Sequence, residues 1–376
     1  MTLLPPPKPS PVPVLTDGVV TLRDHTERDV DEIVVMCRDA EFARWTSVPV
    51  PYEREHAIGF VRDIVASGWA DGSARCWAIE ALADDGQQRY AGNLAVRGAL
   101  VADIGYGLSP WARGRGLMLR AMALATRWAF DQGGVAVVHW RSHVGNVASR
   151  RTAWASGFTF GDTVPRLLEE RGEAVDAWTG WLLPDDEATP RTTWLAAPVL
   201  EGDRVRLRPW RDDDVPRIVE ACSDDRTARW LEFLPSPYAA ADARSWLMRT
   251  VEQASLGRAV NWALADPVSD LALGSITAMD IGGGESEIGY WAHPDARGRG
   301  AMSEAARLVG RHAFTAQVDG GLGLRRLRLI AAVGNLASRH VATSSGFTEV
   351  GVEHALITRR DGAREDAVRY EALPVN

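Results

Sequence analysis

The sequence predicts two consecutive α+β domains, each built on a mixed, mostly antiparallel sheet flanked by helices. Its length of 376 residues exceeds that of one small domain and, at about 100 to 200 residues per domain, favours two domains or at most three. A unit of about 170 residues occurs twice in series, so each copy should be a complete domain with its own core. Segments with strand alternation and segments with helical periodicity follow in the same order in each copy.

The repeat rests on three ungapped matches. Residues 20–45 match 205–230 at 12 of 26 positions, 104–130 match 288–314 at 15 of 27, and 144–159 match 333–348 at 11 of 16. Small changes of offset place the insertions between elements, where loops tolerate them. The chain therefore divides into a proline-rich disordered arm at residues 1–14, a first domain at 15–183, an acidic linker at 184–198 and a second domain at 199–376. We expect a monomer whose two domains pack with pseudo-twofold symmetry.

The strand and helix signals have a fixed order. In the first copy an opening strand at residues 19–23 precedes an amphipathic helix at 29–38, in which Val30, Ile33 and Val34 have helical spacing. A loop with Trp45 then leads into a second helix. The remaining elements are strands around 76–81, 90–96 and 104–108, a long amphipathic helix ending near Phe130, a strand at 135–140, a helix begun by Asn146, and a final strand pair around Arg171 and Gly172, or Asp361 and Gly362 in the second copy.

The composition narrows the class of protein and of partner. Hydrophobic residues make up 46% and charged residues 24% of the chain, which is typical of a globular protein rather than a disordered one. The formal net charge of -8 has the wrong sign for a nucleic-acid binder and mildly favours cationic substrates. No signal peptide or membrane-length apolar run is recognisable, so no membrane is expected. Cys37, Cys76 and Cys222 are too few and too distant for a disulfide framework or a zinc site, and they suit the cytoplasm.

A glycine-rich segment repeated in both copies is the strongest chemical signal. It reads Pro-Trp-Ala-Arg-Gly-Arg-Gly-Leu-Met at residues 110–118 and Pro-Asp-Ala-Arg-Gly-Arg-Gly-Ala-Met at 294–302. Glycines between a strand end and a helix start let successive N–H groups converge on an anion, which the helix dipole also favours. The segment lacks the Gly-Lys-Ser/Thr of a P-loop and the third glycine of a dinucleotide-binding turn. Its recurrence favours an anion site over a mere helix-start turn.

These residues resemble the GNAT superfamily of acyl-CoA N-acyltransferases, whose signature is Arg/Gln-x-x-Gly-x-Gly/Ala after the fourth strand. Both copies are most similar to its ribosomal-protein N-terminal acetyltransferase branch. The shared motifs are Ile-Gly-Tyr, Asn-x-x-Ser and Ser-Gly-Phe, at residues 104–106, 146–149 and 156–158 and again at 288–290, 335–338 and 345–347. The resemblance covers nearly the whole chain and implies two tandem GNAT-like domains. One departure is that Met118 and Met302 replace the final small residue; each fits if its side chain points away from the pyrophosphate.

The resemblance also implies where acetyl-CoA would bind as a cosubstrate, without a metal ion. Its pyrophosphate would lie on the glycine loop and the first helical turn, at Arg113, Gly114, Arg115, Gly116, Leu117, Met118 and Leu119, and at Arg297, Gly298, Arg299, Gly300, Ala301, Met302 and Ser303. Its pantetheine arm would run along the preceding strand end, at Tyr106, Gly107 and Leu108, and at Tyr290, Trp291 and Ala292. Asn146 and Asn335 would bind its amide, although a helix N-cap explains each of them at least as well.

Acetyl transfer to an amine needs a neutral nucleophile, a donor for the developing oxyanion and a proton for the leaving thiolate. The matched acids before Ile-Gly-Tyr, Asp103 and Glu287, are candidate bases or solvated edge charges. Ser149 and Ser338 hold the family position that assists the thiolate, or else only hydrogen-bond within the first helical turn. His143 is a candidate second base or substrate contact, or else part of a polar surface, because alternation places it on one face with His139 and Arg141. Four aromatic residues would form an acceptor wall that holds an amine by cation–π contact: Trp45, Tyr52, Trp230 and Tyr238.

Two classes of function follow. The first is a cytoplasmic, acetyl-CoA-dependent N-acetyltransferase whose acceptor is a primary amine, on a peptide or protein N-terminus or on a small molecule such as an antibiotic or a metabolite. The second is a coenzyme A-binding scaffold or sensor in which one or both copies have lost turnover. Release of thiol in the presence of amines distinguishes the two classes.

Overall fold

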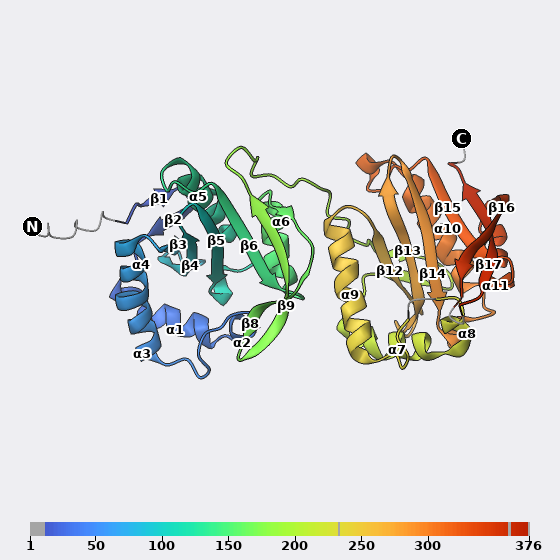
Figure 1. Cartoon of the computed structure of the whole chain (residues 1–376), viewed down its shortest axis with the longest axis horizontal. Coiled ribbons are helices and arrows are strands. Elements are labelled where there is room, and N and C mark those ends of the chain that lie inside the picture. The colour runs from blue at the N-terminus through green and yellow to red at the C-terminus, as the bar shows by residue number, and fades with distance from the viewer. Residues whose placement is uncertain (1–11, 232–233, 360–361, 375–376) are drawn as a thin grey trace, which may run out of the picture. The chain divides into compact units, whose positions relative to one another are not determined.

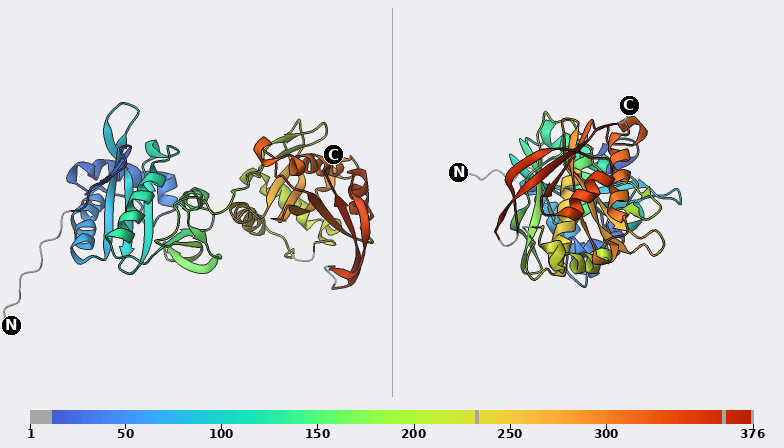
Figure 2. Two further views of the ribbon diagram at one scale, coloured as in Figure 1. Left: turned by 90° about the horizontal axis from the view of Figure 1, so that it is seen from above. Right: turned by 90° about the vertical axis from the view of Figure 1, so that its right-hand side faces the viewer.

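The computed structural model describes residues 12–231, 234–359 and 362–374. The chain divides into two compact units, residues 1–191 and 192–376. In each unit helices pack against a single mixed sheet (Figures 1 and 2). The tandem α+β architecture predicted from the sequence is confirmed.

Unit 1 alternates strands and helices as the hydrophobic pattern predicts. Its helices are α1 Val30–Arg38, α2 Ala40–Arg44, α3 Arg54–Gly59, a π-helical turn Phe60–Val65, α4 Ala66–Asp71, α5 Leu117–Asp131 and α6 Val147–Ala155. Its strands are β1 Leu15–Thr16, β2 Val20–Arg23, β3 Ala74–Leu82, β4 Gln88–Gly98, β5 Val101–Leu108, β6 Val137–His143, β7 Thr159–Phe160, β8 Val164–Glu170 and β9 Glu173–Leu182.

Unit 2 repeats this order with a single uninterrupted second helix. Its helices are α7 Val215–Ser223, α8 Asp225–Ala228, α9 Ala240–Ser255, α10 Ala301–Phe314 and α11 Leu336–Ser344. Its strands are β10 Leu200–Glu201, β11 Arg206–Arg208, β12 Val260–Ala265, β13 Ala272–Gly282, β14 Glu285–Ala292, β15 Arg326–Ala332, β16 Thr348–Thr358 and β17 Arg364–Ala372.

Each sheet contains one parallel pair at its centre. The first sheet has the order β1-β2-β3-β4-β5-β6-β9-β7, with β8 also paired to β9, and the second has the order β10-β11-β12-β13-β14-β15-β17-β16. Among the described strands, β5 with β6 and β14 with β15 run parallel, and the other neighbours run antiparallel. A parallel connection requires a crossover, and the long helices α5 and α10 provide it.

The two faces of the first sheet carry different helices. Trp77 of β3 lies on the face covered by α5, where its ring centroid is 5.3 Å from that of Trp128. Ala78, the next residue, packs with Val30 and Ile33 of α1 on the opposite face. Because successive strand side chains point to opposite sides, α5 and α1 cover opposite faces of the sheet. The face under α5, and under α10 in unit 2, is the back, and the other face is the front.

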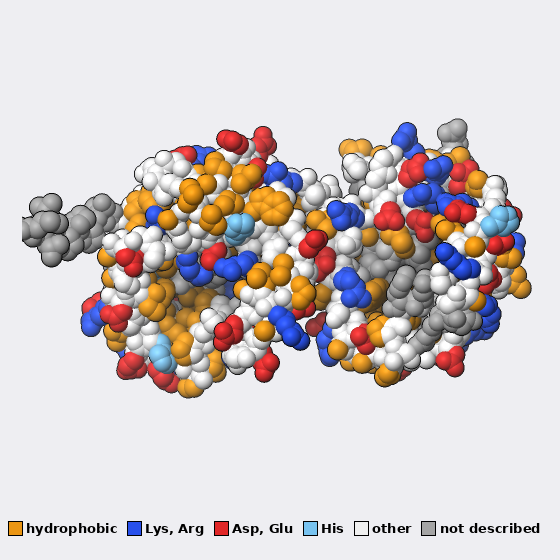
Figure 3. Space-filling view, in the orientation of Figure 1, with side chains coloured by type: hydrophobic (Ala, Val, Ile, Leu, Met, Phe, Trp, Pro, Cys, Tyr) orange, Lys and Arg blue, Asp and Glu red, His pale blue; other side chains and the backbone are white. Residues whose placement is uncertain are grey.

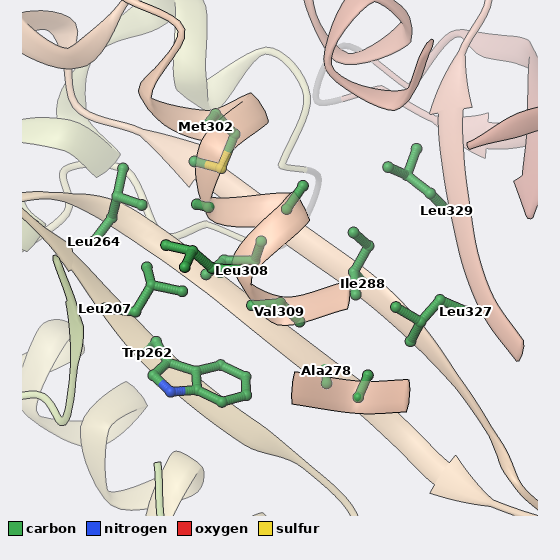
Figure 4. Packing of buried hydrophobic residues seen from close by; sticks show 14 of the residues in the cluster. Leu207, Trp262, Leu264, Ala278, Ile288, Met302, Leu308, Val309, Leu327 and Leu329 are labelled. Atoms are coloured by element: carbon green, nitrogen blue, oxygen red, sulfur yellow. The ribbon is translucent and has the colours of Figure 1, made fainter. Parts of the chain in front are cut away.

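The main core of unit 2 lies between the back of its sheet and α10. Leu308 and Val309 of α10 pack against Ile288 of β14 and Leu327 of β15, and Met302 from the first turn of α10 joins the same cluster (Figure 4). A smaller cluster joins α7 and α9 on the front face. The glycine loops that precede α5 and α10 are therefore anchored by buried helices.

Both copies fasten the segment before their first strand through a buried tryptophan. Trp77 Nε1 donates to the carbonyl of Pro13 at 3.0 Å, and Trp262 Nε1 donates to that of Pro198 at 2.9 Å. Both indoles are fully buried. The carbonyl of Pro13, within the predicted arm, thus contacts the core. Residues 1–11 of the arm and Asp361 of the last predicted strand pair lie outside the described part of the chain.

We expect Trp262→Phe to destabilise unit 2, because it removes the indole donor to Pro198 and leaves a cavity in the core. The predicted loss is about 2–4 kcal/mol of unfolding free energy. Hydrogen exchange in the full chain should show it as lower protection of the amides of β12, with β3 of unit 1 unchanged. Val268→Ala, at a side chain that is 95% exposed, is the control and should change stability by less than about 0.5 kcal/mol. Equal protection of β12 in both variants would contradict the prediction.

Candidate functional site

The central parallel strands separate before they end. The register between β5 and β6 stops at Ile104 opposite Trp140, whereas β5 continues to Leu108. The register between β14 and β15 stops at Glu287 opposite Arg328, whereas β14 continues to Ala292. A gap therefore opens between two strands in the middle of each sheet.

Main-chain groups of β5 and β14 face this gap. The Ser109 N–H group, just after β5, donates to the carbonyl of Ala91 on β4. The carbonyl of Leu100, just before β5, accepts from the Ala136 N–H group, which lies just before β6. Because strand residues alternate in the direction of their main-chain groups, even-numbered residues of β5 point toward β6. Those beyond the register are Tyr106 and Leu108, and the same alternation in unit 2 gives Tyr290 and Ala292. Such an edge can pair with the amides of an extended ligand.

A helix N-terminus lies beside each gap. Gly116 and Gly300 are the N-caps of α5 and α10, with φ of 71° at both. Gly114 and Gly298 also have positive φ, at 72° and 71°, a conformation that glycine adopts without strain. Within the described residues no side chain caps either helix, so the N–H groups of residues 117–119 and 301–303 are available to an anion.

The space over three of these four glycines is open on the protein side. A Cβ at Gly114, Gly116 or Gly298 would meet no atom within 4 Å. A Cβ at Gly300 would lie 2.7 Å from the guanidinium of Arg204, the end of a flexible side chain. Arg204 also donates to the carbonyl of Arg299 at 3.0 Å and so adds a cation beside α10. The repeat gave no signal for Arg204, because the matching position of the first copy is Val19.

Met118 and Met302 point into the core, with exposures of 6% and 8%. Met302 lies among Leu264, Leu308 and Ile288 rather than over the loop (Figure 4). The methionines therefore leave the anion-facing side of the helix start free, as the resemblance requires.

The loop arginines have unequal positions. Arg113 forms an ion pair with Asp39, the N-cap of α2, and Arg297 forms one with Asp224, the N-cap of α8. The resemblance places these two arginines at the pyrophosphate, but in the structure each is paired with a carboxylate and ties the loop to a front helix. Arg115 donates to the carbonyl of Leu82 at 3.0 Å. The side chain of Arg299 is exposed.

The asparagine motifs build helix caps and a hydroxyl pair. Asn146 accepts from Ser149 N–H at 3.1 Å and Asn335 accepts from Ser338 N–H at 3.2 Å, so both are N-caps. The Ser149 hydroxyl lies 3.0 Å from the Tyr106 hydroxyl, and the corresponding Ser338–Tyr290 distance is 2.9 Å. Burial raises the pKa of both tyrosines to about 12, so their hydroxyls stay protonated at neutral pH. The sequence placed only the tyrosine main chain in the site; the repeated Ile-Gly-Tyr was the available signal for the hydroxyl.

The two matched acids have different surroundings. Asp103 forms ion pairs with Arg97 at 3.2 Å and with Arg141 at 2.7 Å. Glu287 makes no ion pair with any described residue and is partly buried. Burial raises the pKa of Glu287, although Arg328 and Arg369 lower it. Since an elevated carboxyl pKa is typical of a general base that works near neutrality, Glu287 is the better base candidate.

The expected acceptor wall is only partly assembled. Trp45 lies near His143, with ring centroids 6.3 Å apart, and His143 Nδ1 is 3.3 Å from Glu170. Trp230 lies near the β15–α11 loop, 3.6 Å from the position of a Cβ on Gly334.

Tyr52 and Tyr238 are instead 6% and 8% exposed and join the front clusters beside Cys37 and Cys222. A cavity of about 240 Å³ still touches Tyr52, together with Arg38, Ala43, Pro49, Val50 and Pro51. The burial of both tyrosines favours packing over direct contact with an amine.

The described residues contain no helix long and apolar enough to span a membrane. No group of three or more His, Cys, Asp or Glu side chains within the same residues is placed to hold a metal ion.

Comparison with known proteins gives a consistent picture. The family model described as Acetyltransferase (GNAT) domain matches residues 20–159 and 204–348. "Putative ribosomal N-acetyltransferase YdaF" of Bacillus subtilis is 29% identical over 177 residues, which cover 46% of this chain and 92% of that protein. "Uncharacterized N-acetyltransferase YoaA" of the same organism is 28% identical over 159 residues, covering 41% and 85%.

Two solved structures are also similar. The RimJ structure of Mycobacterium smegmatis in complex with CoA-disulfide has 21% identity and a TM-score of 0.41, and it covers 47% of this chain and 86% of that one. Ribosomal-protein-S5-alanine acetyltransferase of Vibrio fischeri has 19% identity and a TM-score of 0.42, with coverage of 47% and 96%. Because the family model matches well over half of the sequence, once in each unit, the chain belongs to the GNAT acetyltransferase family and is an acyl-CoA-dependent N-acetyltransferase.

Proposed function

We propose that the chain transfers an acetyl group from acetyl-CoA to the primary amine of a peptide or protein N-terminus, with unit 2 as the main site of reaction and Glu287 as its base. The observation that carries the proposal is the position of Glu287. It is the last residue of β14 in register with β15, so it stands where the gap begins, and burial raises its pKa.

The loop and the gap account for binding of the cosubstrate. The uncapped N–H groups at the start of α10 suit a pyrophosphate, and the main chain of Tyr290 and Ala292 suits the amides of pantetheine. When bound, acetyl-CoA supplies a thioester carbonyl that an amine can attack. The same elements are present at α5 and β5 of unit 1.

Glu287 and the hydroxyl pair can move the two protons of the reaction. A peptide amine arrives largely protonated at neutral pH, and a carboxylate with an elevated pKa can remove a proton from it, directly or through one water. Ser338 lies on the first turn of α11 and can donate its hydroxyl proton to the leaving sulfur. Tyr290, 2.9 Å from Ser338 and protonated at neutral pH, can replace that proton. The second proton, which the amine nitrogen loses after attack, can return through water to Tyr290 and so balances the proton given to sulfur.

The peptide acceptor is supported by two observations. The part of β15 beyond Arg328 also borders the gap and can pair with an extended main chain while β14 holds pantetheine. The relative YdaF, of which 92% is matched, carries the name of a putative ribosomal N-acetyltransferase. The alternative, a coenzyme A-binding scaffold, predicts binding without release of thiol in the presence of any amine.

We predict that Glu287→Gln lowers kcat/KM for an N-terminal peptide by about 10²–10⁴-fold. Because burial raises the pKa of Glu287 and only its ionised form accepts a proton, the wild-type rate should rise with pH through a pKa above that of an ordinary glutamate. The Gln variant should lose this rise. Thiol release measured against pH at saturating acetyl-CoA checks both expectations. Asp103→Asn is the matched control and should change the rate by less than about three-fold, because the Asp103 carboxylate is held by two arginines. The opposite ranking of the two variants would move the reaction to unit 1.

A second prediction concerns the glycine loops. Gly116→Val and Gly300→Val place a β-branched side chain at φ of 71°, where the pyrophosphate would lie. The space is open at Gly116, whereas at Gly300 the added Cβ would also meet the flexible guanidinium of Arg204 at 2.7 Å. Each should weaken acetyl-CoA binding in its own unit by about a hundred-fold or more, which corresponds to about 3–6 kcal/mol. Calorimetry should find two sites per wild-type chain and one strong site in each variant.

Gly310→Ala is the control for the loop variants. It lies inside α10 at negative φ, with no atom within 4 Å of the added Cβ, and should leave affinity unchanged while stabilising the helix by up to about 1 kcal/mol. Two undiminished sites in both valine variants would mean that the loops are only helix starts.

A further inference from the structure

The front face of unit 1 carries a charge arrangement that unit 2 lacks. Arg97 of β4 lies opposite Asp103 of β5. On β6, His139 is in register with Asp103, and Arg141 lies two residues further along on the same face. The two arginines contact opposite oxygens of one carboxylate, at 3.2 Å and 2.7 Å. Two guanidinium cations against one carboxylate leave one positive charge at this position.

Arg97 also covers the start of the gap. Gly105 is the first residue of β5 beyond the register with β6, and a Cβ on it would lie 2.2 Å from Nη2 of Arg97. The guanidinium therefore rests against bare main chain at the point where an acyl acceptor would approach. A Cβ on Gly107, the next front-facing position, would meet the ring of Phe42 at 2.2 Å. Along the front of β5, Gly105 is thus covered by the polar Arg97 and Gly107 by the apolar Phe42.

Both guanidinium groups retain unused donors. A guanidinium has five N–H donors in a planar fork that fits carboxylate and phosphate oxygens. Asp103 is the one hydrogen-bond partner that the described part of the chain gives to either Arg97 or Arg141. Their side chains are 55% and 40% exposed, so a ligand can reach them.

The other charged groups of this face do not cancel the positive charge. On β6, His139 is exposed and His143 lies 3.3 Å from Glu170. Glu170 itself is 3.0 Å from Arg171 on the β8–β9 hairpin. Figure 3 shows basic side chains beside an acidic one in the middle of unit 1, next to a hollow with apolar side chains.

Unit 2 provides the internal comparison. The residue opposite Glu287 is Met279, where unit 1 has Arg97 opposite Asp103. The residue that matches Arg141 is Ile330, two positions beyond Arg328. Unit 2 has Arg328 where unit 1 has His139, and Arg369 of β17, which is paired with Glu353, also acts on Glu287. The same fold thus tolerates apolar side chains at both positions, and the arginine pair is not needed to form the sheet.

We propose that the gap of unit 1 binds a ligand bearing a carboxylate or phosphate group, which Arg97 and Arg141 hold beside Gly105. The inference rests on the proposed function only in taking the front of the gap as the acceptor side. The two units would then prefer different ligands. Unit 1 would bind a ligand that carries an acidic group, whereas unit 2 would bind an amine beside Glu287 whether or not the amine carries an acidic group.

The test is calorimetry on the full chain with saturating coenzyme A and three amidated dipeptides, Ala-Asp, Ala-phosphoserine and Ala-Asn. The wild type should bind at least one of the two acidic peptides about ten-fold or more tightly than Ala-Asn, and which one binds better identifies carboxylate or phosphate as the group held. Arg97→Met with Arg141→Ile, which installs the residues of unit 2, should reduce that preference to within about two-fold.

Two further variants separate the proposal from a merely structural ion pair. Arg97→Lys with Arg141→Lys keeps the charge and should retain part of the preference, because ammonium groups lack the planar fork. Asp103→Asn removes the competing carboxylate and should tighten binding of the acidic peptide by about three-fold or more.

Equal binding of all three peptides by the wild type, absence of binding up to millimolar concentration, or a preference unchanged by the Met and Ile substitutions would overturn the proposal. Thiol release serves as the separate readout of the proposed function. A chain that binds acidic peptides through Arg97 and Arg141 but releases no thiol would refute the transferase assignment of the gap while leaving the anion site intact.

Discussion

The separation of the central parallel strands is the constraint on which the rest of the site depends. In unit 1 the register covers residues 101–104 of β5, and in unit 2 it covers residues 285–287 of β14. A parallel pair needs a crossover helix, and a right-handed crossover starts at the carboxyl end of the first strand. The helix N-terminus and the unpaired strand edge are therefore brought to the same end of the sheet. Both offer main-chain N–H groups, so an anion and an amide chain can be bound by one continuous molecule.

This dependence on the main chain explains why the duplication keeps some features and varies others. Both units have glycines at φ near 71° and a strand, β5 or β14, that continues beyond its parallel register; in the proposed site a change at either feature would move main-chain donors. The side chains on the front of the sheet are not under that constraint. Arg97 in one unit and Met279 in the other stand at matched positions on strands that pair in the same way. Divergence in ligand preference can therefore proceed without disturbing the loop or the core.

Most of the fold was predictable because it follows local rules. Alternation and helical spacing predicted the order of elements, the repeated glycines predicted the helix starts, and Asn146 and Asn335 behave as the N-caps that their positions suggest. The site was less predictable where long-range partners decide the outcome. Arg113 pairs with a carboxylate 74 positions away, which no local pattern indicates. The burial of Tyr52 and Tyr238 depends on how the front loops fold over α1 and α7, and aromatic residues near a motif do not reveal that.

The acid pair shows how the same sequence position acquires different chemistry. Asp103 and Glu287 precede the same motif, and the sequence alone makes them equivalent. Burial raises the pKa of Glu287 above its ordinary value, so the folded state holds its proton more tightly than the unfolded state does. Any stability gained from this group is present at low pH and is lost as pH rises through the folded pKa. At neutral pH an ionised Glu287 thus opposes folding. A partly buried carboxyl without an ion pair at the opening of the gap is thus hard to explain by stability, and the proposed removal of a proton from an amine would account for it.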